Sequence, residues 1–370
     1  MYTEKDLVAI AKRDGNKKRN YLVVNRLQGK HVPASPKAAF CLFSELAGRV
    51  RKAHEGERLL VIGFAETATA IGSAVAIELG AMYIQTTRED LPGAEYLFFS
   101  EEHSHATAQK LVKDELDRIM GEVERIIFVE DELTTGKTIV NLIRVLEESY
   151  GEGTAFSVAS LLNGMDEEAM SLYRRKNIEL HYVVKTKHQE YTQIAEQFSS
   201  DGEYIPCSIQ SSRVEELTLK GGMNPRRLVD SKQYNKACER LWEQLEKRLK
   251  EKQFKRVLLL GTEECMYPSL FAGYRLEQQG VQVFCHSTTR SPIAVSRDAG
   301  YPFRTRYELR SLYDVERITY LYDLTACDLV IIITDAAPFS MEGAYSLINA
   351  VGLKNENILM VRWCLDENFL

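Results

Sequence analysis

The sequence predicts an α/β protein in which a doubly wound parallel sheet is followed by a second, smaller α/β domain of Rossmann-like pattern. Two observations predict this class. Short apolar runs rich in β-branched residues alternate with segments of helical apolar spacing along most of the chain, as in parallel strands joined by helices. In addition, 370 residues are more than one ordinary hydrophobic core accommodates, so two domains are expected.

The first domain is expected to span residues 1–198. Each expected strand is a short, mostly apolar run, and each expected helix repeats its apolar residues with a helical period. The strands are expected at 21–25, 59–63, 81–88, 126–129, 154–162 and 178–184. The helices are expected at 38–52, 71–79, 107–120, 139–146 and 166–175. In such a fold the ligand binds at the carboxyl ends of the strands.

Residues 199–252 are expected to form a linker arm and a connecting helix. The arm lacks a sustained period, whereas Asp230 is placed to cap a helix whose apolar stripe includes Trp242. The paired Arg226 and Arg227 could reach back to an anion, but a solvated pair is the favoured expectation. In the second domain, 253–370, strands are expected at 256–261, 281–286, 318–322, 328–334 and 358–362, with helices at 270–276 and 340–351.

The composition is that of a soluble globular protein, with 45% apolar and 27% charged residues. A formal net charge of −6 gives no basic footprint for nucleic acid. The N-terminal segment is too charged for a signal peptide, and no apolar run reaches membrane-spanning length, so a cytoplasmic protein without membrane contact is expected. The seven cysteines never form a C-x-x-C pair, which argues against a zinc or disulfide framework.

The segment 125–142, RIIFVEDELTTGKTIVNL, has the features of a phosphate-binding loop. A short apolar strand is followed by two acids, Glu130 and Asp131. A small, hydroxyl-rich turn and a helical pattern come next, so that N–H groups at the helix start would point toward an anion. The turn consists of Thr134, Thr135, Gly136, Lys137 and Thr138.

Two kinds of loop fit this pattern to different degrees. A P-loop, G-x-x-x-x-G-K-[ST], needs a glycine where this chain has Asp131, and a carboxylate there would face the phosphates. VEDELTTGKT instead resembles the signature of the type I phosphoribosyltransferases. The resemblance implies that Glu130 and Asp131 hold the ribose 2- and 3-hydroxyls of phosphoribosyl pyrophosphate and that the turn binds its 5-phosphate. An ordinary βα loop is the plain alternative, although an acidic pair and a complete phosphate turn rarely coincide.

The loop after the strand at 59–63 is built largely from small residues, which allow close approach of the backbone to a ligand. It contains Ala65, Glu66, Thr67, Ala68 and Thr69. The resemblance implies that this loop binds pyrophosphate through backbone amides and that Arg88, near the next strand end, also contacts it. For Arg88 the alternative is an ordinary surface arginine. Glu66 departs from the pattern, because a carboxylate beside pyrophosphate requires a metal or a cation between them.

Two further segments are candidates for substrate contact. Residues 89–106 lack a helical period, and the resemblance implies a hood that closes over the active site and excludes water. Its His103 and His105 are candidates for positioning the nucleophile or contacting pyrophosphate; with nearby acids they also resemble a metal site, but no third ligand cluster is visible. Lys30 and His31 form a cationic pair in an earlier turn, which either binds substrate or is solvated.

In the second domain, two polar loops follow strands at one edge of the sheet. Glu263 and Glu264 lie on one loop, and Thr289, Arg290 and Ser291 lie on the other. Together with Pro292 the latter resemble the name-giving motif of the TRSP domain, which follows a phosphoribosyltransferase domain in proteins encoded near bacterial tellurite-resistance and stress genes. The two loops are expected to form a second small-molecule site, the alternative being a structural Arg–Glu contact.

The function implied by these resemblances is phosphoribosyl transfer to an unidentified, base-like nitrogenous acceptor, with release of pyrophosphate, in the biosynthesis of a nucleotide-like metabolite. Mg²⁺ is expected on the substrate's own oxygens rather than on protein ligands. A homodimer is compatible with the sequence. Two alternatives remain: a regulator that senses phosphoribosyl pyrophosphate or a nucleotide without turnover, and a P-loop-like kinase, which Asp131 disfavours.

Overall fold

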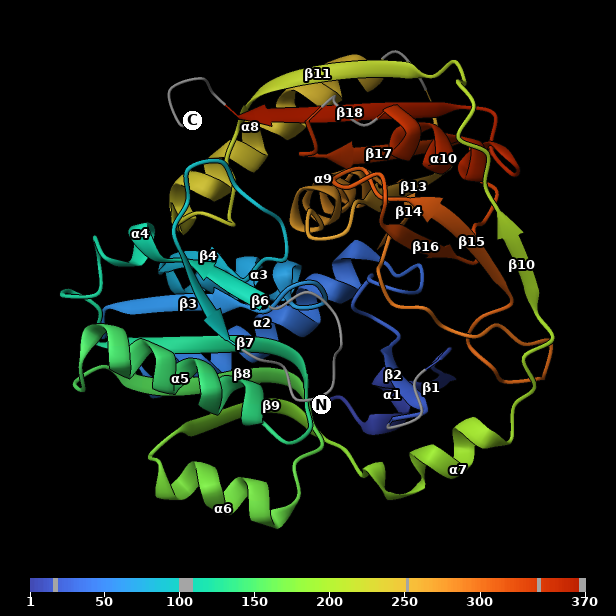
Figure 1. Cartoon of the computed structure of the whole chain (residues 1–370). Helices are drawn as coiled ribbons and strands as arrows, with labels where there is room; N and C mark the ends of the chain where they lie inside the picture. The colour runs from blue at the N-terminus through green and yellow to red at the C-terminus, as the bar shows by residue number, and fades with distance from the viewer. Residues whose placement is uncertain (16–18, 100–108, 251–252, 338–340, 366–370) are drawn as a thin grey trace.

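The structure, a computed structural model, describes residues 1–15, 19–99, 109–250, 253–337 and 341–365. It confirms the α/β class: two mainly parallel sheets are stacked with helices between them (Figure 1). None of the described helices combines the length and the apolar character needed to cross a membrane.

The first sheet belongs to the predicted first domain. Its strands, in spatial order, are β12 (Val229–Asp230), β4 (Met82–Gln85), β3 (Leu59–Gly63), β7 (Arg125–Leu133), β8 (Ala155–Asn163) and β9 (Glu179–Lys185). All pairs are parallel except β12 with β4. The chain moves from β3 to β4 on one side and then to β7 on the other. This reversal of strand order opens a crevice at the carboxyl ends of β3 and β7, where α/β proteins bind ligands.

Four helices accompany this sheet: α2 (Pro36–Ala53), α3 (Thr69–Leu79), α5 (Lys137–Tyr150) and α6 (Glu167–Arg175). The start of α2 follows from its sequence, because Pro36 is suited to the first turn and the Ser35 hydroxyl accepts a hydrogen bond from Ala38 N at 3.2 Å. The central strands β3 and β7 are buried over their apolar residues, as the sequence predicts for strands covered on both faces.

The second sheet is parallel and has the order β11 (Glu215–Gly222), β18 (Ile358–Leu365), β17 (Leu329–Thr334), β13 (Arg256–Gly261) and β14 (Gln282–Ser287). Its helices are α8 (Ser231–Leu249), α9 (Tyr267–Gln278) and α10 (Met341–Gly352). A small sheet of β10 (Glu203–Pro206), β15 (Thr305–Arg310) and β16 (Ile318–Tyr322) lies beside it (Figure 1).

The arm predicted at 199–252 contributes strands to three sheets. β10 pairs with β15, β11 with β18, and β12 with β4. All three lie at sheet edges, where partner backbone rather than burial defines the strand, which is why no apolar period marks them in the sequence. The predicted cap of α8 is confirmed, since the Asp230 carboxylate accepts a hydrogen bond from Gln233 N at 2.9 Å. Trp242 is buried in the core, as expected.

The two stacked sheets share one apolar core. A single group of buried side chains includes Leu46 and Ile71 from α2 and α3 and Leu241 and Phe271 from α8 and α9. The residues from Thr69 to Ala76 in α3 are all buried, because α2, α8, α9 and β3 pack around this helix. The loops that begin and end near α3 are therefore held by both halves of the chain.

The N-terminal hairpin packs against the second domain. It consists of β1 (Val8–Lys12) and β2 (Tyr21–Asn25), preceded by α1 (Glu4–Leu7) and covered by α7 (Tyr191–Glu196). Lys12 N donates to Tyr301 Oη at 2.8 Å, and Asp14 N donates to Pro292 O at 3.0 Å. The N-terminal hairpin and a part of the second domain thus lie beside the carboxyl ends of the first sheet (Figure 1).

One local prediction is wrong, and one strand is longer than expected. The expected helix at 107–120 is replaced, within the described residues, by β6 (Gln109–Val112) and the short α4 (Lys113–Leu116). β6 pairs with β5 (Tyr96–Phe99), so a partner strand rather than a helical face buries its apolar residues. The strand expected at 126–129 is also longer, since β7 extends to Leu133 through pairing with β8.

Candidate active site

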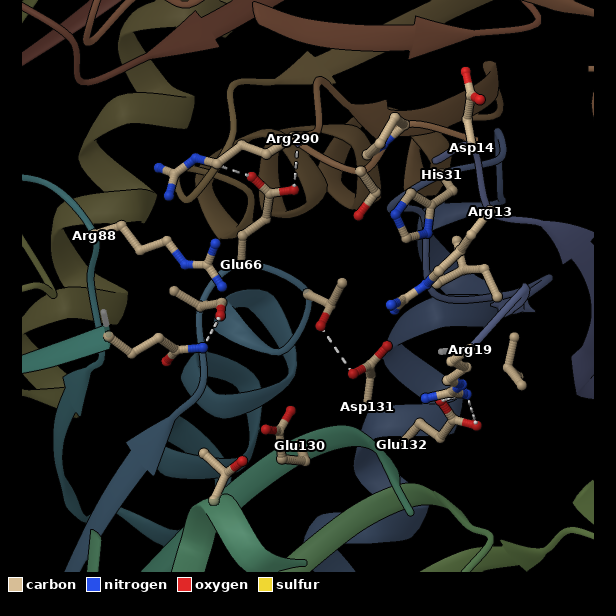
Figure 2. Close-up of a pocket in the computed structure, with 18 residues that line it drawn as sticks. Arg13, Asp14, Arg19, His31, Glu66, Arg88, Glu130, Asp131, Glu132 and Arg290 are labelled. Carbon is tan, nitrogen blue, oxygen red and sulfur yellow. Dashed lines mark hydrogen bonds and ion pairs between the residues drawn. The ribbon is translucent and has the colours of Figure 1, made fainter. Parts of the chain in front are cut away.

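A cavity of about 380 Å³ lies at the crevice between the first sheet and the second domain (Figure 2). Three regions meet around it: the N-terminal hairpin, the loops of the first sheet, and a turn of the second domain. It is lined by Arg13, Asp14, Arg19, Leu22, Val23, His31, Ala65, Glu66, Thr67, Arg88, Gln109, Glu130, Asp131, Glu132, Thr138, Arg290, Ser291 and Pro292.

The two predicted acids lie in the wall of this cavity, on β7. Asp131 Oδ1 accepts a hydrogen bond from Thr67 Oγ1 at 2.8 Å, which ties β7 to the loop after β3. Burial, followed by the neighbouring Glu132, raises the pKa of Asp131 to about 6. Glu132 pairs with Arg19 at 2.7 Å and lies 3.3 Å from His188 Nε2. The strand therefore presents three acids at the cavity, one of them neutralised by an arginine.

The predicted phosphate turn leads into α5. Gly136 caps this helix with a φ of 69° in the left-handed region, and its carbonyl accepts a hydrogen bond from Tyr173 Oη at 2.8 Å. A Cβ at this position would stand 2.3 Å from Tyr173 Oη, so conformation and space both require glycine. Thr138, in the first turn of α5, lines the cavity. The turn thus has the shape that anion binding at a helix N-terminus needs.

A ring of hydrogen bonds holds the loop after β3. Ala65 N donates to Thr86 Oγ1 at 2.8 Å, the Thr86 hydroxyl donates to Gln109 Oε1 at 2.6 Å, and Gln109 Nε2 donates to Ala65 O at 2.9 Å. The ring fixes the backbone of the loop where it faces the cavity. Of the predicted pyrophosphate residues, the cavity is lined by Ala65, Glu66 and Thr67, whereas Ala68 and Thr69 are buried behind them.

The carboxylate of Glu66 has the cations that the sequence required for it. Lys30 Nζ lies 3.3 Å from Glu66 Oε1, and Arg290 Nε lies 3.6 Å from Oε2. The Thr289 hydroxyl and the Arg290 backbone N–H also donate to Oε1, at 2.5 and 3.0 Å. Although burial opposes it, Lys30 and Arg290 lower the pKa of Glu66 to about 2. The motif that names the second domain is thus bonded directly to the loop after β3.

Lys30 and His31 are buried, so the solvated alternative is wrong. Lys30 is 1% exposed, and its Nζ donates to the carbonyls of Glu263 and Thr288 at 2.8 and 3.0 Å. His31 lines the cavity, and burial, followed by the charge of Lys30, lowers its pKa to about 3. The predicted cationic pair therefore contains one cation, Lys30, and one neutral imidazole.

The predicted second site is not separate from this cavity. Arg290 Nε pairs with Glu263 Oε2 at 2.8 Å, and Arg290 Nη2 pairs with Glu264 Oε1 at 3.1 Å. The structural Arg–Glu contact that the sequence left as the alternative is therefore present. Glu263 and Glu264 are 1% and 2% exposed, whereas Arg290 and Ser291 line the same cavity as Glu130.

These contacts extend into a buried group of charges, the interdomain ion cluster. Arg317 pairs with Glu89 at 2.6 Å, and Arg226 pairs with Glu264 at 2.8 Å and with Asp335 at 2.5 Å. The prediction that Arg226 is solvated is wrong for this reason; Arg227 is partly exposed and pairs with Glu115 at 3.2 Å. The cluster consists of Lys30, Glu66, Glu89, Arg226, Glu263, Glu264, Arg290, Arg317 and Asp335.

Arg88 lies at the cavity, where it is predicted. Its backbone N–H donates to Glu264 Oε1 at 3.1 Å, and Figure 2 shows its side chain extending toward the loop of Glu66. The predicted hood histidines, His103 and His105, lie outside the described residues. The described flanks of the hood are β5 and β6, and Gln109 of β6 lines the cavity.

Arg13, Arg19 and Gln109 line the cavity without having been singled out in the sequence. The two arginines come from the N-terminal hairpin, which reaches the cavity through its contacts with the second domain. Their only local signal is the basic stretch KRDGNKKR at 12–19. No motif marks Gln109, because its role depends on the pairing of β6 with β5.

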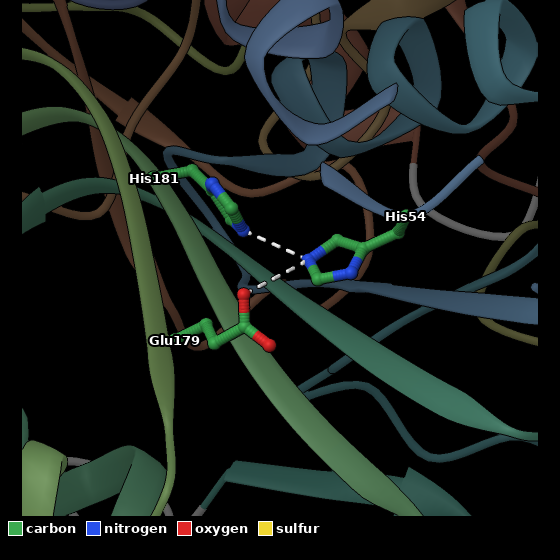
Figure 3. Close-up of side chains that lie close together, drawn as sticks. All are labelled: His54, Glu179 and His181. Carbon is green, nitrogen blue, oxygen red and sulfur yellow. Dashed lines mark hydrogen bonds and ion pairs between the residues drawn. The ribbon is translucent and has the colours of Figure 1, made fainter. Parts of the chain in front are cut away.

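A second group of potential ligands lies at the opposite end of the first sheet (Figure 3). His54 follows α2, and His181 and Glu179 begin β9. The Nε2 atoms of the two histidines are 2.9 Å apart, and Glu179 Oε2 lies 3.8 Å from His54 Nε2. Burial, followed by the charge of His54, lowers the pKa of His181 to about 4, so its imidazole is neutral near pH 7. Two imidazoles and a carboxylate are common ligands of Zn²⁺.

Comparison with known proteins identifies two family domains along the chain. A family model described as "Phosphoribosyl transferase" matches residues 7–190, and one described as "TRSP domain C terminus to PRTase_2" matches residues 222–351. No curated protein sequence matches the chain.

Solved structures similar to the chain include several adenine phosphoribosyltransferases. The protein from Rhodothermus marinus is 18% identical over 49% of this chain and 96% of that chain, with a TM-score of 0.36. The protein from Thermoanaerobacter pseudethanolicus is 19% identical over 49% and 97%, with a TM-score of 0.35. The protein from Giardia lamblia, in complex with 9-deazaadenine, is 17% identical over 51% and 100%, with a TM-score of 0.35.

Proposed function

The chain belongs to the family in which a phosphoribosyltransferase domain is followed by a TRSP domain, and from this premise we propose that it transfers the phosphoribosyl group of phosphoribosyl pyrophosphate to a nitrogen of a small, base-like acceptor. The enzyme class is that of the phosphoribosyltransferases. The proposed product is a nucleotide-like metabolite, and the co-product is pyrophosphate.

The geometry of the cavity supports a specific placement of the substrate. The ribose hydroxyls would donate to Glu130 and Asp131, whose carboxylates line the cavity on β7. The 5-phosphate would lie at the N-terminus of α5, near Thr138. The pyrophosphate would lie on the backbone of the loop at Ala65, with Arg88 beside it. Acids face hydroxyls and N–H groups face phosphates, which is the pairing that their chemistry favours.

The residues present also fit a magnesium ion carried by the substrate. Carboxylate oxygens at the ribose position and phosphate oxygens are the hard donors that Mg²⁺ prefers, and Glu66 Oε2 is a buried oxygen without a hydrogen-bond partner among the described residues. Bound to the substrate's own oxygens, Mg²⁺ would supply charge neutralisation on the leaving pyrophosphate. The protein's own residues would hold the ribose and the departing pyrophosphate.

In the proposed reaction the bond between C1 of the ribose and the pyrophosphate oxygen breaks, and a bond from C1 to the acceptor nitrogen forms. Positive charge develops on the ribose as the first bond breaks. The carboxylates of Glu130 and Asp131 would hold the ribose and stabilise this charge, while Arg88 would hold the departing anion. The acceptor proton would leave with solvent or pyrophosphate.

The observation that carries the proposal is the meeting of Glu130, Asp131 and Thr138 with the braced loop at Ala65 around one cavity. The test is incubation with phosphoribosyl pyrophosphate, Mg²⁺ and a panel of nitrogen bases, with pyrophosphate release and substrate affinity both measured. Glu130→Gln is expected to weaken affinity about tenfold, because a charge-assisted hydrogen bond is lost. Glu124→Gln, which alters an exposed acid paired with Arg58 before β7 begins, is the matched control.

Absence of phosphoribosyl pyrophosphate binding by the unaltered protein would refute the proposal. Binding without pyrophosphate release for any base would favour a sensor of this ligand over an enzyme.

A further inference from the structure

One wall of the cavity has no contact with phosphoribosyl pyrophosphate in the proposed placement. Glu130, Asp131, Thr138 and the loop at Ala65 all belong to the first sheet. The opposite wall is formed by the N-terminal hairpin and by the turn of the second domain that contains Ser291 and Pro292. A molecule that attacks the ribose from this side would therefore touch residues of both domains.

The hairpin also contributes Arg13, whose guanidinium has no hydrogen-bond or ion-pair partner among the described residues. Arg19 is neutralised by Glu132 at 2.7 Å, and Arg290 is neutralised within the interdomain ion cluster. By contrast, no hydrogen bond or ion pair joins the Arg13 side chain to any part of the chain that the structure describes. Figure 2 shows the Arg13 guanidinium directed into the cavity, toward Asp131. A partly buried cation in this position favours an anionic ligand.

The wall of the cavity beside Arg13 also contains apolar side chains and one hydroxyl. Leu22 and Val23 of β2 line the cavity and are 8% and 5% exposed. Pro292 lines it from the second domain, next to Ser291, whose carbonyl is fixed by a hydrogen bond from Tyr322 Oη at 2.8 Å. Apolar side chains beside one cation and one hydroxyl match a ring that carries an acidic substituent.

We propose that the phosphoribosyl acceptor binds between the N-terminal hairpin and the Ser291–Pro292 turn, and that it is a nitrogen heterocycle bearing a carboxylate, which pairs with Arg13. This inference rests on the proposed function. It assigns the second domain a part in the site itself, since Ser291 and Pro292 form the acceptor wall.

The anion is a carboxylate rather than a phosphate because of the charge balance. A single guanidinium compensates one negative charge, and Asp14, which also lines the cavity, would repel a dianion. Asp14 pairs with Arg306 at 2.9 Å. Burial, followed by the charge of Arg19, lowers the pKa of Arg13, whereas the nearby Glu132 and Asp131 raise it.

The test titrates the full chain, loaded with phosphoribosyl pyrophosphate and Mg²⁺, with two heterocyclic acids of single negative charge and their uncharged counterparts: nicotinate with nicotinamide, and orotate with uracil. At least one acid is expected to bind about tenfold more tightly than its counterpart, and Arg13→Ala is expected to remove this preference. The affinity for phosphoribosyl pyrophosphate should change less than about twofold in Arg13→Ala. Arg26→Ala, an exposed arginine just after β2, is the matched control and should retain the preference.

Three outcomes would overturn the inference while leaving the proposed function intact: no acid binds, the uncharged rings bind as well as the acids, or Arg13→Ala weakens phosphoribosyl pyrophosphate as much as it weakens the acid. The last outcome would mean that Arg13 contacts the substrate's phosphates. If the unaltered protein does not bind phosphoribosyl pyrophosphate, this result refutes the proposed function, on which the inference rests.

A separate observation carries a second inference, at the opposite end of the first sheet. His54 Nδ1 lies 3.3 Å from Glu57 Oε1, and Nε2 faces His181 (Figure 3). Because a carboxylate accepts hydrogen bonds, this contact favours a proton on Nδ1 and a lone pair on Nε2. Ser157 Oγ lies 3.2 Å from the same Nε2. A carboxylate that orients a histidine in this way is typical of the surroundings of metal ligands.

We infer that His54, His181 and Glu179 bind a divalent transition-metal ion, with Zn²⁺ as the probe. Glu179 at present pairs with Arg125 at 3.3 Å. It is free to turn toward a metal because Arg125 keeps a closer partner in Glu57, at 2.6 Å. Because Glu179 is half exposed, ions reach the group from solvent.

Calorimetric titration of the full, reduced chain with Zn²⁺ tests this site. One ion is expected to bind, and His181→Ala is expected to weaken that binding at least about tenfold, with a smaller loss for Glu57→Gln. Glu55→Gln, which removes a neighbouring exposed acid, should have no effect. Equal binding by the unaltered chain and His181→Ala, or no binding by either, would show that the two imidazoles only share a hydrogen bond.

Discussion

At the scale of single residues, the most informative side chain is Glu66. In the sequence it is an acid where pyrophosphate is expected, and this position needs a cation. In the structure it has two, Lys30 at 3.3 Å and Arg290 at 3.6 Å, together with hydrogen bonds from Thr289 and from the Arg290 backbone. The acid therefore links the first sheet to the second domain instead of repelling the substrate.

Arg290→Ala is expected to lower the free energy of unfolding by about 3 kcal/mol or more, because it leaves buried carboxylates without their cation. Urea unfolding monitored by circular dichroism measures the loss. Adding Glu66→Gln to Arg290→Ala should restore part of it, since one of the uncompensated charges is then removed. A loss below about 1 kcal/mol for Arg290→Ala would contradict this account of the cluster.

Replacement of Asp131 is expected to raise the stability of the protein and to weaken substrate binding. Its pKa of about 6 in the folded chain lies above the ordinary value of 3.8. Protonated Asp131 therefore stabilises the folded chain. This contribution is fully present below pH 3.8 and is lost as the pH rises through about 6. Asp131→Asn should therefore be more stable than the unaltered protein at pH 8, by about 2 kcal/mol.

The same substitution should weaken binding of phosphoribosyl pyrophosphate, because an amide oxygen is a poorer acceptor for ribose hydroxyls than a carboxylate. In the unaltered protein the affinity should fall as the pH drops below about 6, and in Asp131→Asn this step should be absent. Calorimetric titration between pH 5 and pH 8 measures both. Unchanged affinity at pH 8 would contradict a role for Asp131 at the ribose.

At the scale of elements, β7 and α5 carry the first half of the site. β7 reaches Leu133 because β8 continues beside it, so the acids stand on a paired strand rather than in a free loop. The turn between β7 and α5 is fixed by Gly136, whose left-handed φ of 69° and contact with Tyr173 leave no room for a side chain. The strand sets the position of the acids, and the turn sets that of the helix N-terminus.

Gly136→Ala is expected to lower stability by about 1–3 kcal/mol and to weaken phosphate binding, because the turn must shift to relieve strain and overlap. Chemical unfolding and titration with phosphoribosyl pyrophosphate measure the two effects. Gly121→Ala is the matched control, since a Cβ there meets nothing within 4 Å. Equal behaviour of the two variants would show that the conformation of Gly136 does not matter.

At the scale of the whole molecule, the two predicted domains are joined by an apolar core and by the interdomain ion cluster. α3 is enclosed by α2 from its own domain and by α8 and α9 from later in the chain. The N-terminal hairpin, in turn, is bonded to residues near 292–301. The cavity therefore exists only where both halves are folded together.

Unfolding is accordingly expected to be a single cooperative transition, and a fragment of residues 1–198 should fail to bind phosphoribosyl pyrophosphate. The fragment lacks β12, α8 and Arg290, so the buried face of α3 and the carboxylate of Glu66 would be exposed. Circular dichroism and titration with phosphoribosyl pyrophosphate measure both expectations. Two separate transitions, or a fragment that binds normally, would show that the domains are independent.

The sequence by itself determined the α/β class, most of the strands and helices, the acids on β7, the phosphate turn and the loop at Ala65. These features are local, since apolar period, turn chemistry and spacing lie within one stretch of chain. The burial of Lys30 and Arg226 and the pairing of β6 depend instead on residues distant in sequence, whose contacts leave no local pattern.

Only the tertiary structure decided that the TRSP motif belongs to the first cavity. Arg290 lies more than two hundred residues after Glu66 in the sequence, and they meet because a hydrophobic core shared by α3, α8 and α9 stacks the two sheets. Burial then makes each unpaired charge costly, so the cations and acids of the two domains pair with one another. The local sequence specifies the chemistry of each loop, and the shared core specifies which loops face the same substrate.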